Sequence, residues 1–228
     1  MMAVNRSFSD VRKVILFAQK STGAEEKVAF YNDWASNYEQ DVGILEYRAP
    51  SLAAELLSAA YRGNRDTAAV LDVACGTGLV SSELHNMGFR NFFGVDGSHA
   101  MLDIAKRKGL YKELKQCMLG MEPLPVQAGS FDAVVTVGAL SAGNVPVAVV
   151  KELWQVAKPG GYVCITTRGD VDNLKYRTEL ENTFDSMVQD ALWVQVDVRE
   201  VEQWERAVSN KEAEHIPGVV YLYRKSSD

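Results

Sequence analysis

Mostly apolar runs alternate with amphipathic segments through the middle of the chain. The apolar runs cover residues 69–73, 91–96, 114–119, 131–138 and 162–167. Runs that are apolar on both faces are typical of parallel strands covered by helices on both sides. The segments 79–87, 100–107 and 145–156 between them have the spacing of amphipathic helices. Because crossovers between parallel strands are right-handed, this alternation predicts a doubly wound, mostly parallel sheet.

The start of the chain has a different pattern. Residues 1–24 are polar and mixed, and we expect them to be loosely held. Helical spacing over residues 25–38 aligns Tyr31, Trp34 and Tyr38 on one stripe. Such a stripe either packs into the core or closes over a binding site. A second helix is predicted over residues 49–61, with Pro50 in its first turn.

The end of the chain predicts a long helix over residues 173–189 and then two extended segments, 193–198 and 218–224. Their alternation and the charged connection between them favour an antiparallel hairpin that completes a seven-stranded sheet. We therefore expect a single α/β domain over residues 25–228. It divides into an N-terminal helical cap (25–64), a core (68–168) and a C-terminal helix and hairpin (169–228).

Composition narrows the class of protein. The chain has 228 residues, 47% of them hydrophobic and 24% charged, as in a globular domain with a full core. A formal net charge of -6 argues against a nucleic-acid partner. The three cysteines have unrelated spacings, which suggests unbridged thiols in a reducing compartment. No secretory signal or membrane span is predicted, so we expect a cytoplasmic protein, with the nucleus left open.

The most informative stretch is VLDVACGTGLVSSEL, residues 70–84. A predicted buried strand ends near Asp72, passes through a turn containing Gly76 and Gly78, and leads into a helix. In a doubly wound sheet, ligands bind at the carboxyl ends of the strands where the strand order reverses. Gly76 would let the backbone approach a ligand, and Gly78 would let the chain turn into the helix. This stretch therefore predicts a ligand site.

Two classes of ligand use such a turn. A dinucleotide needs G-x-G-x-x-G, but the third glycine position is Ser81. S-adenosylmethionine carries a sulfonium in place of a pyrophosphate, so the Asp72 carboxylate favours it. A turn or cap hydrogen bond is the structural alternative for Asp72. Asp96, 18 residues after Gly78, ends the second strand and can accept both ribose hydroxyls of either ligand. Its structural alternative is to cap the following helix.

Four motifs in order resemble class I S-adenosylmethionine-dependent methyltransferases. They are VLDVACGTGLVSSEL, GVDGSHAML, EPLPVQAGSFDAVV and KPGGYVCITTR, and together they span residues 68–168. Four linked motifs are far more specific than one glycine turn. The resemblance implies a Rossmann-like fold with S-adenosylmethionine as the cofactor. Two positions depart from the family pattern: Ala74 replaces its first glycine, and Gly120 stands where an acid often lies near the adenine.

The resemblance also implies cofactor contacts at matching positions. These would reach the methionyl end, the ribose, the adenosine and the adenine, with further residues over the cofactor. In that order they are Ala74, Cys75, Gly76 and Val137; Asp96; Gly97 and Met101; Met121 and Glu122; and Tyr31, Tyr38 and Arg48. Arg48 would suit the cofactor carboxylate. No metal site is predicted.

The sequence favours methyl transfer without naming the acceptor. Transfer from a sulfonium needs alignment more than a fixed catalytic triad, and no triad is visible. The segment after the fourth strand, VGALSAGNVP, lacks the Asn/Asp-Pro-Pro-aromatic tetrapeptide of enzymes that methylate planar amino groups of adenine or glutamine. A small-molecule or protein acceptor remains. The alternatives are a cofactor-binding regulatory module without turnover and, ranked lower, an NAD-dependent oxidoreductase. The sequence does not predict the oligomeric state.

Overall fold

A seven-stranded sheet in the order β3-β2-β1-β4-β5-β7-β6 forms the centre of the computed structural model, which describes residues 6–18, 23–209, 211 and 214–227. The strands are β1 (Ala69–Val73), β2 (Asn91–Asp96), β3 (Tyr111–Gln116), β4 (Phe131–Thr136), β5 (Ala157–Arg168), β6 (Trp193–Arg206) and β7 (His215–Lys225). The first five pair in parallel, whereas β7 pairs antiparallel with both β5 and β6. The predicted fold class, including the C-terminal hairpin, is confirmed.

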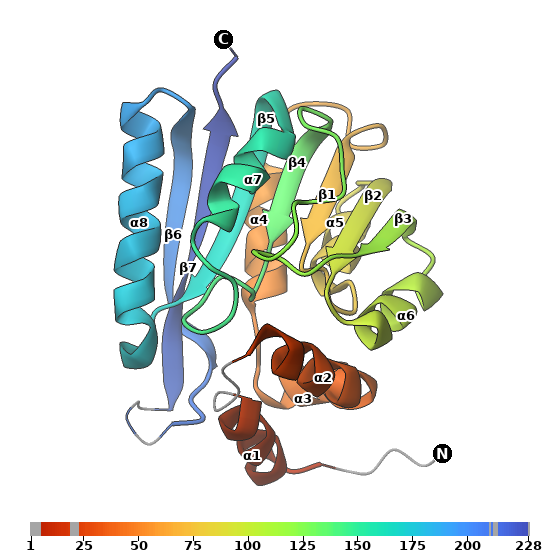
Figure 1. Cartoon of the computed structure of the whole chain (residues 1–228), viewed down its shortest axis with the longest axis vertical. Helices are drawn as coiled ribbons and strands as arrows, with labels where there is room; N and C mark the ends of the chain where they lie inside the picture. Colours follow the sequence, from red (N-terminus) through yellow and green to blue (C-terminus); the bar gives the residue numbers. More distant parts are fainter. Residues whose placement is uncertain (1–5, 19–22, 210, 212–213, 228) are drawn as a thin grey trace.

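Helices cover both faces of the sheet, as the apolar runs predicted (Figure 1). One face packs against α4 (Ala49–Ala60) and α5 (Leu79–Asn86), and the other against α7 (Val149–Val156) and α8 (Leu174–Gln189), which follows a short 3-10 turn (Val171–Asn173). Along β1, Val70 packs in the core on the α4 and α5 side and Leu71 in the core on the α7 and α8 side, because successive side chains point to opposite faces. No helix in the described part of the chain is long and apolar enough to cross a membrane.

The third strand lies three residues earlier than the sequence predicted. β3 ends at Gln116, and residues 117–119 leave the sheet instead of continuing it. Tyr111 begins the strand and donates its hydroxyl to the Asp72 carboxylate of β1 at 2.7 Å. The Cys117 backbone N–H then donates to the Asp96 carbonyl at 3.0 Å. The shift leaves the apolar residues 117–119 outside the strand, where they line a cavity at the end of the sheet.

The N-terminal helices α1 (Phe8–Ala18), α2 (Ala24–Trp34) and α3 (Tyr38–Ile44) lie together at the end of the sheet where β1 and β4 end (Figure 1). The helix predicted over residues 25–38 is divided by a 3-10 turn (Ala35–Asn37). Across this turn the Trp34 indole N–H donates to the buried Asp41 carboxylate at 2.6 Å. That carboxylate also pairs with Arg6 at 3.0 Å.

Helix α1 falls within the segment that we expected to be loosely held. Ser7 and Asp10 cap it reciprocally: the Ser7 N–H donates to the Asp10 carboxylate at 2.9 Å, and the Asp10 N–H donates to the Ser7 hydroxyl oxygen at 3.3 Å. Val11 is fully buried, so the helix is anchored by packing as well. Residues 1–5 and 19–22 of that segment lie outside the described residues.

The C-terminal hairpin depends on the absence of a side chain at Gly218. A Cβ at this position would lie inside the van der Waals envelope of the buried Trp204 ring on β6. We expect Gly218→Ala to lower the free energy of unfolding by about 2 kcal/mol, because neither strand can move without breaking its ladder. Urea denaturation measures the change. Gly43→Ala on α3 is the control, because its Cβ would meet open space; equal effects of the two substitutions would contradict the packing argument.

Candidate functional site

The glycine turn between β1 and α5 is built from left-handed backbone. Ala74, Gly76 and Gly78 have φ angles of 58°, 53° and 87°. Glycine adopts this region without strain, and Gly78 is the N-cap residue that directly precedes α5. A Cβ on Gly76 would meet open space, so the restriction there is conformational. The turn therefore presents backbone atoms to the end of the sheet, as the sequence predicted for a ligand site.

Ala74 is the strained member of this turn. In the left-handed region a residue with a side chain is destabilised by about 1–2 kcal/mol relative to glycine. Replacement by glycine recovers only part of this, because glycine has more conformational freedom in the unfolded chain. We expect Ala74→Gly to raise the free energy of unfolding by about 0.5–1 kcal/mol in urea denaturation. The control is Ala59→Gly on the exposed side of α4, which should lower it by about 1 kcal/mol. A loss of stability in Ala74→Gly would show that the alanine is not strained.

Asp96 joins the glycine turn to the end of β2. Its carboxylate accepts the Gly76 N–H and the Ser98 N–H, each at 2.8 Å. Burial raises its pKa, and these backbone hydrogen bonds partly oppose that shift. Ser98, not Asp96, caps α6 (His99–Arg107), by accepting the Met101 N–H at 3.2 Å. The carboxylate therefore lies at the opening of the turn and can still accept further hydrogen bonds in addition to those two.

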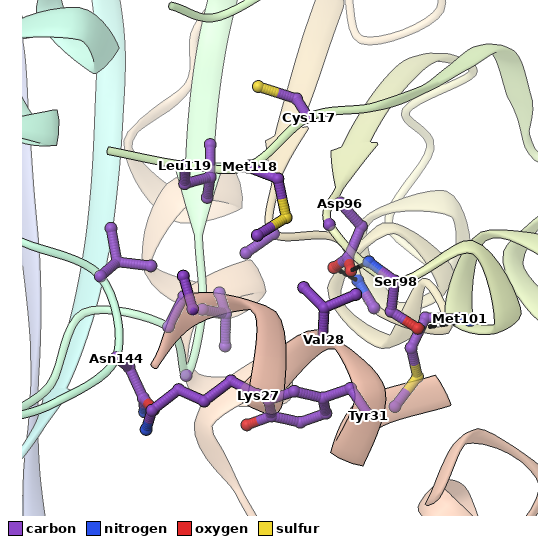
Figure 2. Close-up of a pocket in the computed structure, with 18 of the residues that line it drawn as sticks. Lys27, Val28, Tyr31, Asp96, Ser98, Met101, Cys117, Met118, Leu119 and Asn144 are labelled. Atoms are coloured by element: carbon purple, nitrogen blue, oxygen red, sulfur yellow. Dashed lines mark hydrogen bonds between the residues drawn. The ribbon is translucent and has the colours of Figure 1, made fainter. Parts of the chain in front are cut away.

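A cavity of about 160 Å³ lies between this carboxylate and helix α2 (Figure 2). It contains many of the positions predicted as cofactor contacts. Those that line it are Tyr31, Tyr38, Ala74, Gly76, Asp96, Gly97, Met101 and Val137. These residues come from α2, α3, α6 and the segments at the carboxyl ends of β1, β2 and β4, so the topology, rather than sequence proximity, brings them together.

Five predicted contacts do not line this cavity. Asp72 and Cys75 line an adjoining space of about 40 Å³, which shares Ala74, Gly76 and Val137 with the main cavity. The remaining three lie elsewhere. Arg48 donates from its guanidinium to the Gln203 carbonyl at 3.1 Å, Met121 is 65% exposed, and the Glu122 carboxylate accepts the Met118 N–H at 3.1 Å.

Asp72 is buried behind the turn. One carboxylate oxygen accepts the hydroxyls of Ser81 at 2.8 Å and Tyr111 at 2.7 Å. The other is buried and has no hydrogen-bond partner among the described residues. Burial raises the pKa of Asp72 to about 6, against the effect of the two hydroxyl hydrogen bonds. An unpartnered carboxylate oxygen beside a cavity is a favourable neighbour for a cationic group.

The structure adds residues that sequence reasoning missed. Lys27 on α2 reaches along the cavity and donates to the Asn144 side-chain oxygen at 2.8 Å (Figure 2). Lys27 is the cationic side chain among the described residues that line this cavity, whereas Arg48, which the resemblance matched to the cofactor carboxylate, does not line it. Burial, followed by repulsion from Arg168, lowers the pKa of Lys27. Cys117, Met118 and Leu119 form an apolar wall, a consequence of the early end of β3.

The family departure at Gly120 has a steric reason. This glycine has a φ of 79°, and a Cβ would collide with the ring of Pro146 in the loop before α7. The acid that the resemblance led us to expect therefore has no room at this position.

The three residues of the aromatic stripe differ in exposure, and the two tyrosines line the first cavity whereas Trp34 does not. Trp34 is 6% exposed, whereas Tyr31 and Tyr38 are half-buried and line the cavity. Both tyrosines, together with Lys27 and Gly138, also line a second cavity of about 590 Å³ on the side of β5 and β6. The two cavities therefore adjoin each other, and Tyr31 and Tyr38 belong to the wall that they share.

Comparison with known proteins decides the family. A methyltransferase domain profile matches residues 71–165, which include the glycine turn and Asp96. The human protein named methyltransferase-like protein 27 is 49% identical over 187 residues, covering 82% of this chain and 76% of that protein. The chain belongs to the methyltransferase family. A Lactococcus lactis demethylmenaquinone methyltransferase is 35% identical over 154 residues, or 63% of this methyltransferase chain and 59% of that enzyme.

Solved structures agree with this family fold. A crystal structure described as a SAM-dependent methyltransferase from Methanosarcina mazei has a TM-score of 0.54 with this methyltransferase at 21% identity. The match covers 72% of this chain and 94% of that one. At this identity the likeness shows the fold alone. The residues of the glycine turn and of Asp96 thus occupy the carboxyl end of a methyltransferase sheet.

Proposed function

We propose that this methyltransferase uses S-adenosylmethionine to methylate a small-molecule or protein acceptor. The observation that carries the proposal is the Asp96 carboxylate, held by Gly76 and Ser98 at the mouth of the left-handed turn. A carboxylate in that position can accept both hydroxyls of a ribose. The family supports the use of this cofactor, and the first cavity supplies a site with matching chemistry.

The residues present fit each part of the cofactor. The unpartnered oxygen of Asp72, beside the small adjoining space, suits the positively charged methionyl end, and Lys27 in the first cavity suits its carboxylate. The apolar wall of Met101, Met118 and Leu119 suits the adenine. When bound, the cofactor supplies an activated methyl group on sulfur. The chain then has to align the acceptor and exclude water, and Tyr31 and Tyr38 stand between the two cavities for that purpose.

The acceptor class and the subfamily belong to the same proposal. Segments 30–50 and 136–146 resemble the methyltransferase-like protein encoded in the Williams–Beuren syndrome region of vertebrates. The negative net charge disfavours a nucleic-acid acceptor. Cys75, Cys117 and Cys164 are buried, free thiols, which supports a reducing compartment such as the cytoplasm.

Thermal shift tests the cofactor. S-adenosylmethionine and S-adenosylhomocysteine at about 100 times their dissociation constants should each stabilise the protein by about 2.7 kcal/mol, and NAD should not. The Asp72 carboxylate would repel a pyrophosphate. Stabilisation by NAD alone would overturn the assignment in favour of an oxidoreductase.

A radiolabelled methyl screen tests turnover. The full chain with methyl-labelled cofactor is incubated with an extract fractionated by size. Label in the small-molecule or protein fraction supports the proposal and selects the acceptor class, whereas label in nucleic acid contradicts it. Tight cofactor binding with no labelled product in any fraction would favour the regulatory alternative.

A further inference from the structure

The second cavity, beyond the two tyrosines, has a distinct lining. Its volume is about 590 Å³, enough for a small organic molecule, and it adjoins the proposed cofactor cavity at Tyr31, Tyr38 and Gly138. Five aromatic side chains line it, from α2, α3, the α3–α4 connection and β6. They are Tyr31, Trp34, Tyr38, Tyr47 and Trp204. Aromatic rings gathered around one space are a known means of binding ammonium groups.

Glu205 on β6 is the unusual polar residue of this cavity. It follows the buried Trp204 and lines the cavity wall, and its carboxylate has no hydrogen bond or ion pair to another described residue. Its charge acts on the hydroxyls of Tyr31, Tyr38 and Tyr47, whose pKa values are raised first by burial and then in part by Glu205. The carboxylate and the three tyrosines therefore face the same space.

Other charged groups of the cavity have partners of their own. Arg168 pairs with Asp170 at 3.6 Å, and Lys211 pairs with Asp172 at 2.7 Å. The Arg206 guanidinium lies 3.9 Å from the centroid of the Phe8 ring. Lys27 donates to Asn144. Burial, opposed by Arg168 and reinforced by Asp170, raises the pKa of Glu205 to about 7.

A carboxylate without a partner, set among aromatic rings, is best stabilised by an incoming cation. An anionic acceptor would instead meet the negative charge of Glu205, because Asp170 and Asp172 are balanced by Arg168 and Lys211. Resting on the proposed methyl transfer, we propose that the second cavity binds a small amine, whose ammonium group lies between Glu205 and the rings of Tyr31, Tyr38 and Tyr47. Glu205 then accepts the proton that the nitrogen must lose before methylation.

The step balances without a further reactant. One proton passes from the ammonium to a Glu205 oxygen, which frees the nitrogen lone pair. That pair forms the new N–C bond while the C–S bond breaks and its electrons stay on sulfur, leaving a neutral thioether and a methylated ammonium. Glu205 returns its proton to water when the product leaves. A base with a pKa near the working pH is suited to this transfer.

Binding of three matched probes tests the inference without relying on turnover. The full chain saturated with S-adenosylhomocysteine is titrated calorimetrically at about pH 7.5 with 2-phenylethylamine, 2-phenylethanol and phenylacetate. We expect the amine to bind at least about tenfold more tightly than the alcohol or the acid. Glu205→Gln should weaken binding of the amine by at least about tenfold and leave the affinity for the alcohol unchanged. Glu202→Gln, exposed on the same strand, is the matched control and should change neither.

A second readout uses the wild-type protein alone, in case the variant does not fold. Carbon NMR of the glutamate carboxyls follows the Glu205 titration, and its midpoint should fall when the amine is added, since a bound cation favours the charged carboxylate. Preference for phenylacetate, no binding of the amine, or a Glu205→Gln variant that binds the amine normally would each overturn the inference. If the wild-type protein does not bind S-adenosylhomocysteine at all, the proposed function itself is contradicted.

Discussion

Asp96→Ala will lower the affinity for S-adenosylmethionine by at least about 100-fold, or roughly 3 kcal/mol, while the fold persists. The carboxylate is expected to accept two ribose hydroxyls, and it also holds the Gly76 and Ser98 N–H groups of the turn in place. Removing it therefore takes away both the contacts and the preorganisation of the site. Isothermal titration calorimetry measures the affinity, and circular dichroism checks the fold.

Two further variants make the Asp96 result specific. Asp96→Asn keeps the size of the side chain and one hydrogen-bond-accepting oxygen, so we expect an intermediate loss of affinity for S-adenosylmethionine of about tenfold. Asp103→Asn, exposed on α6, should bind like the wild type. An unchanged affinity in Asp96→Ala would remove this residue from the site.

Asp72→Asn will make the protein more stable at neutral pH and flatten its pH dependence. The folded-state pKa of Asp72 is raised by burial to about 6, above its ordinary value of 3.8. The folded state therefore holds this proton more strongly, and the stability it contributes is present below pH 3.8 and lost as the pH rises through 6. The loss amounts to about 3 kcal/mol at most, and the variant should not show it.

Urea denaturation at about pH 4 and pH 7.5 measures this difference for wild type and variant. Asp66→Asn, exposed just before β1, is the control and should follow the wild type. The same Asp72→Asn variant should bind S-adenosylmethionine about tenfold more weakly, because the negative charge that would face the cationic methionyl end is lost. A variant with the wild-type pH profile would show that Asp72 is not a destabilised buried acid.

The part of the site that the sequence predicted is the part determined by local pattern. Gly76, Gly78 and Asp96 follow directly from strand ends and their spacing, because parallel strands bring their carboxyl ends to one edge. The residues that were missed depend on tertiary packing. Lys27 has the sequence context of a solvated helix residue, and only the placement of α2 over the sheet turns it toward the cavity.

Two further differences have local physical causes. The sequence ended the sixth strand near residue 198, but β6 continues to Arg206 through a register shift between Val201 and Glu205. This irregularity hides Glu205 from a simple alternation, so no functional role was predicted for it. Arg48 was assigned to the cofactor by family resemblance, whereas at the start of α4 its guanidinium binds the Gln203 carbonyl.

The most direct test of the central claim is a crystal structure of the full chain with S-adenosylhomocysteine. The adenosine should occupy the cavity between α2 and the glycine turn, with both ribose hydroxyls on the Asp96 carboxylate and the adenine against Met118 and Leu119. Density for the nucleoside at another place on the protein, with this cavity vacant, would contradict the account.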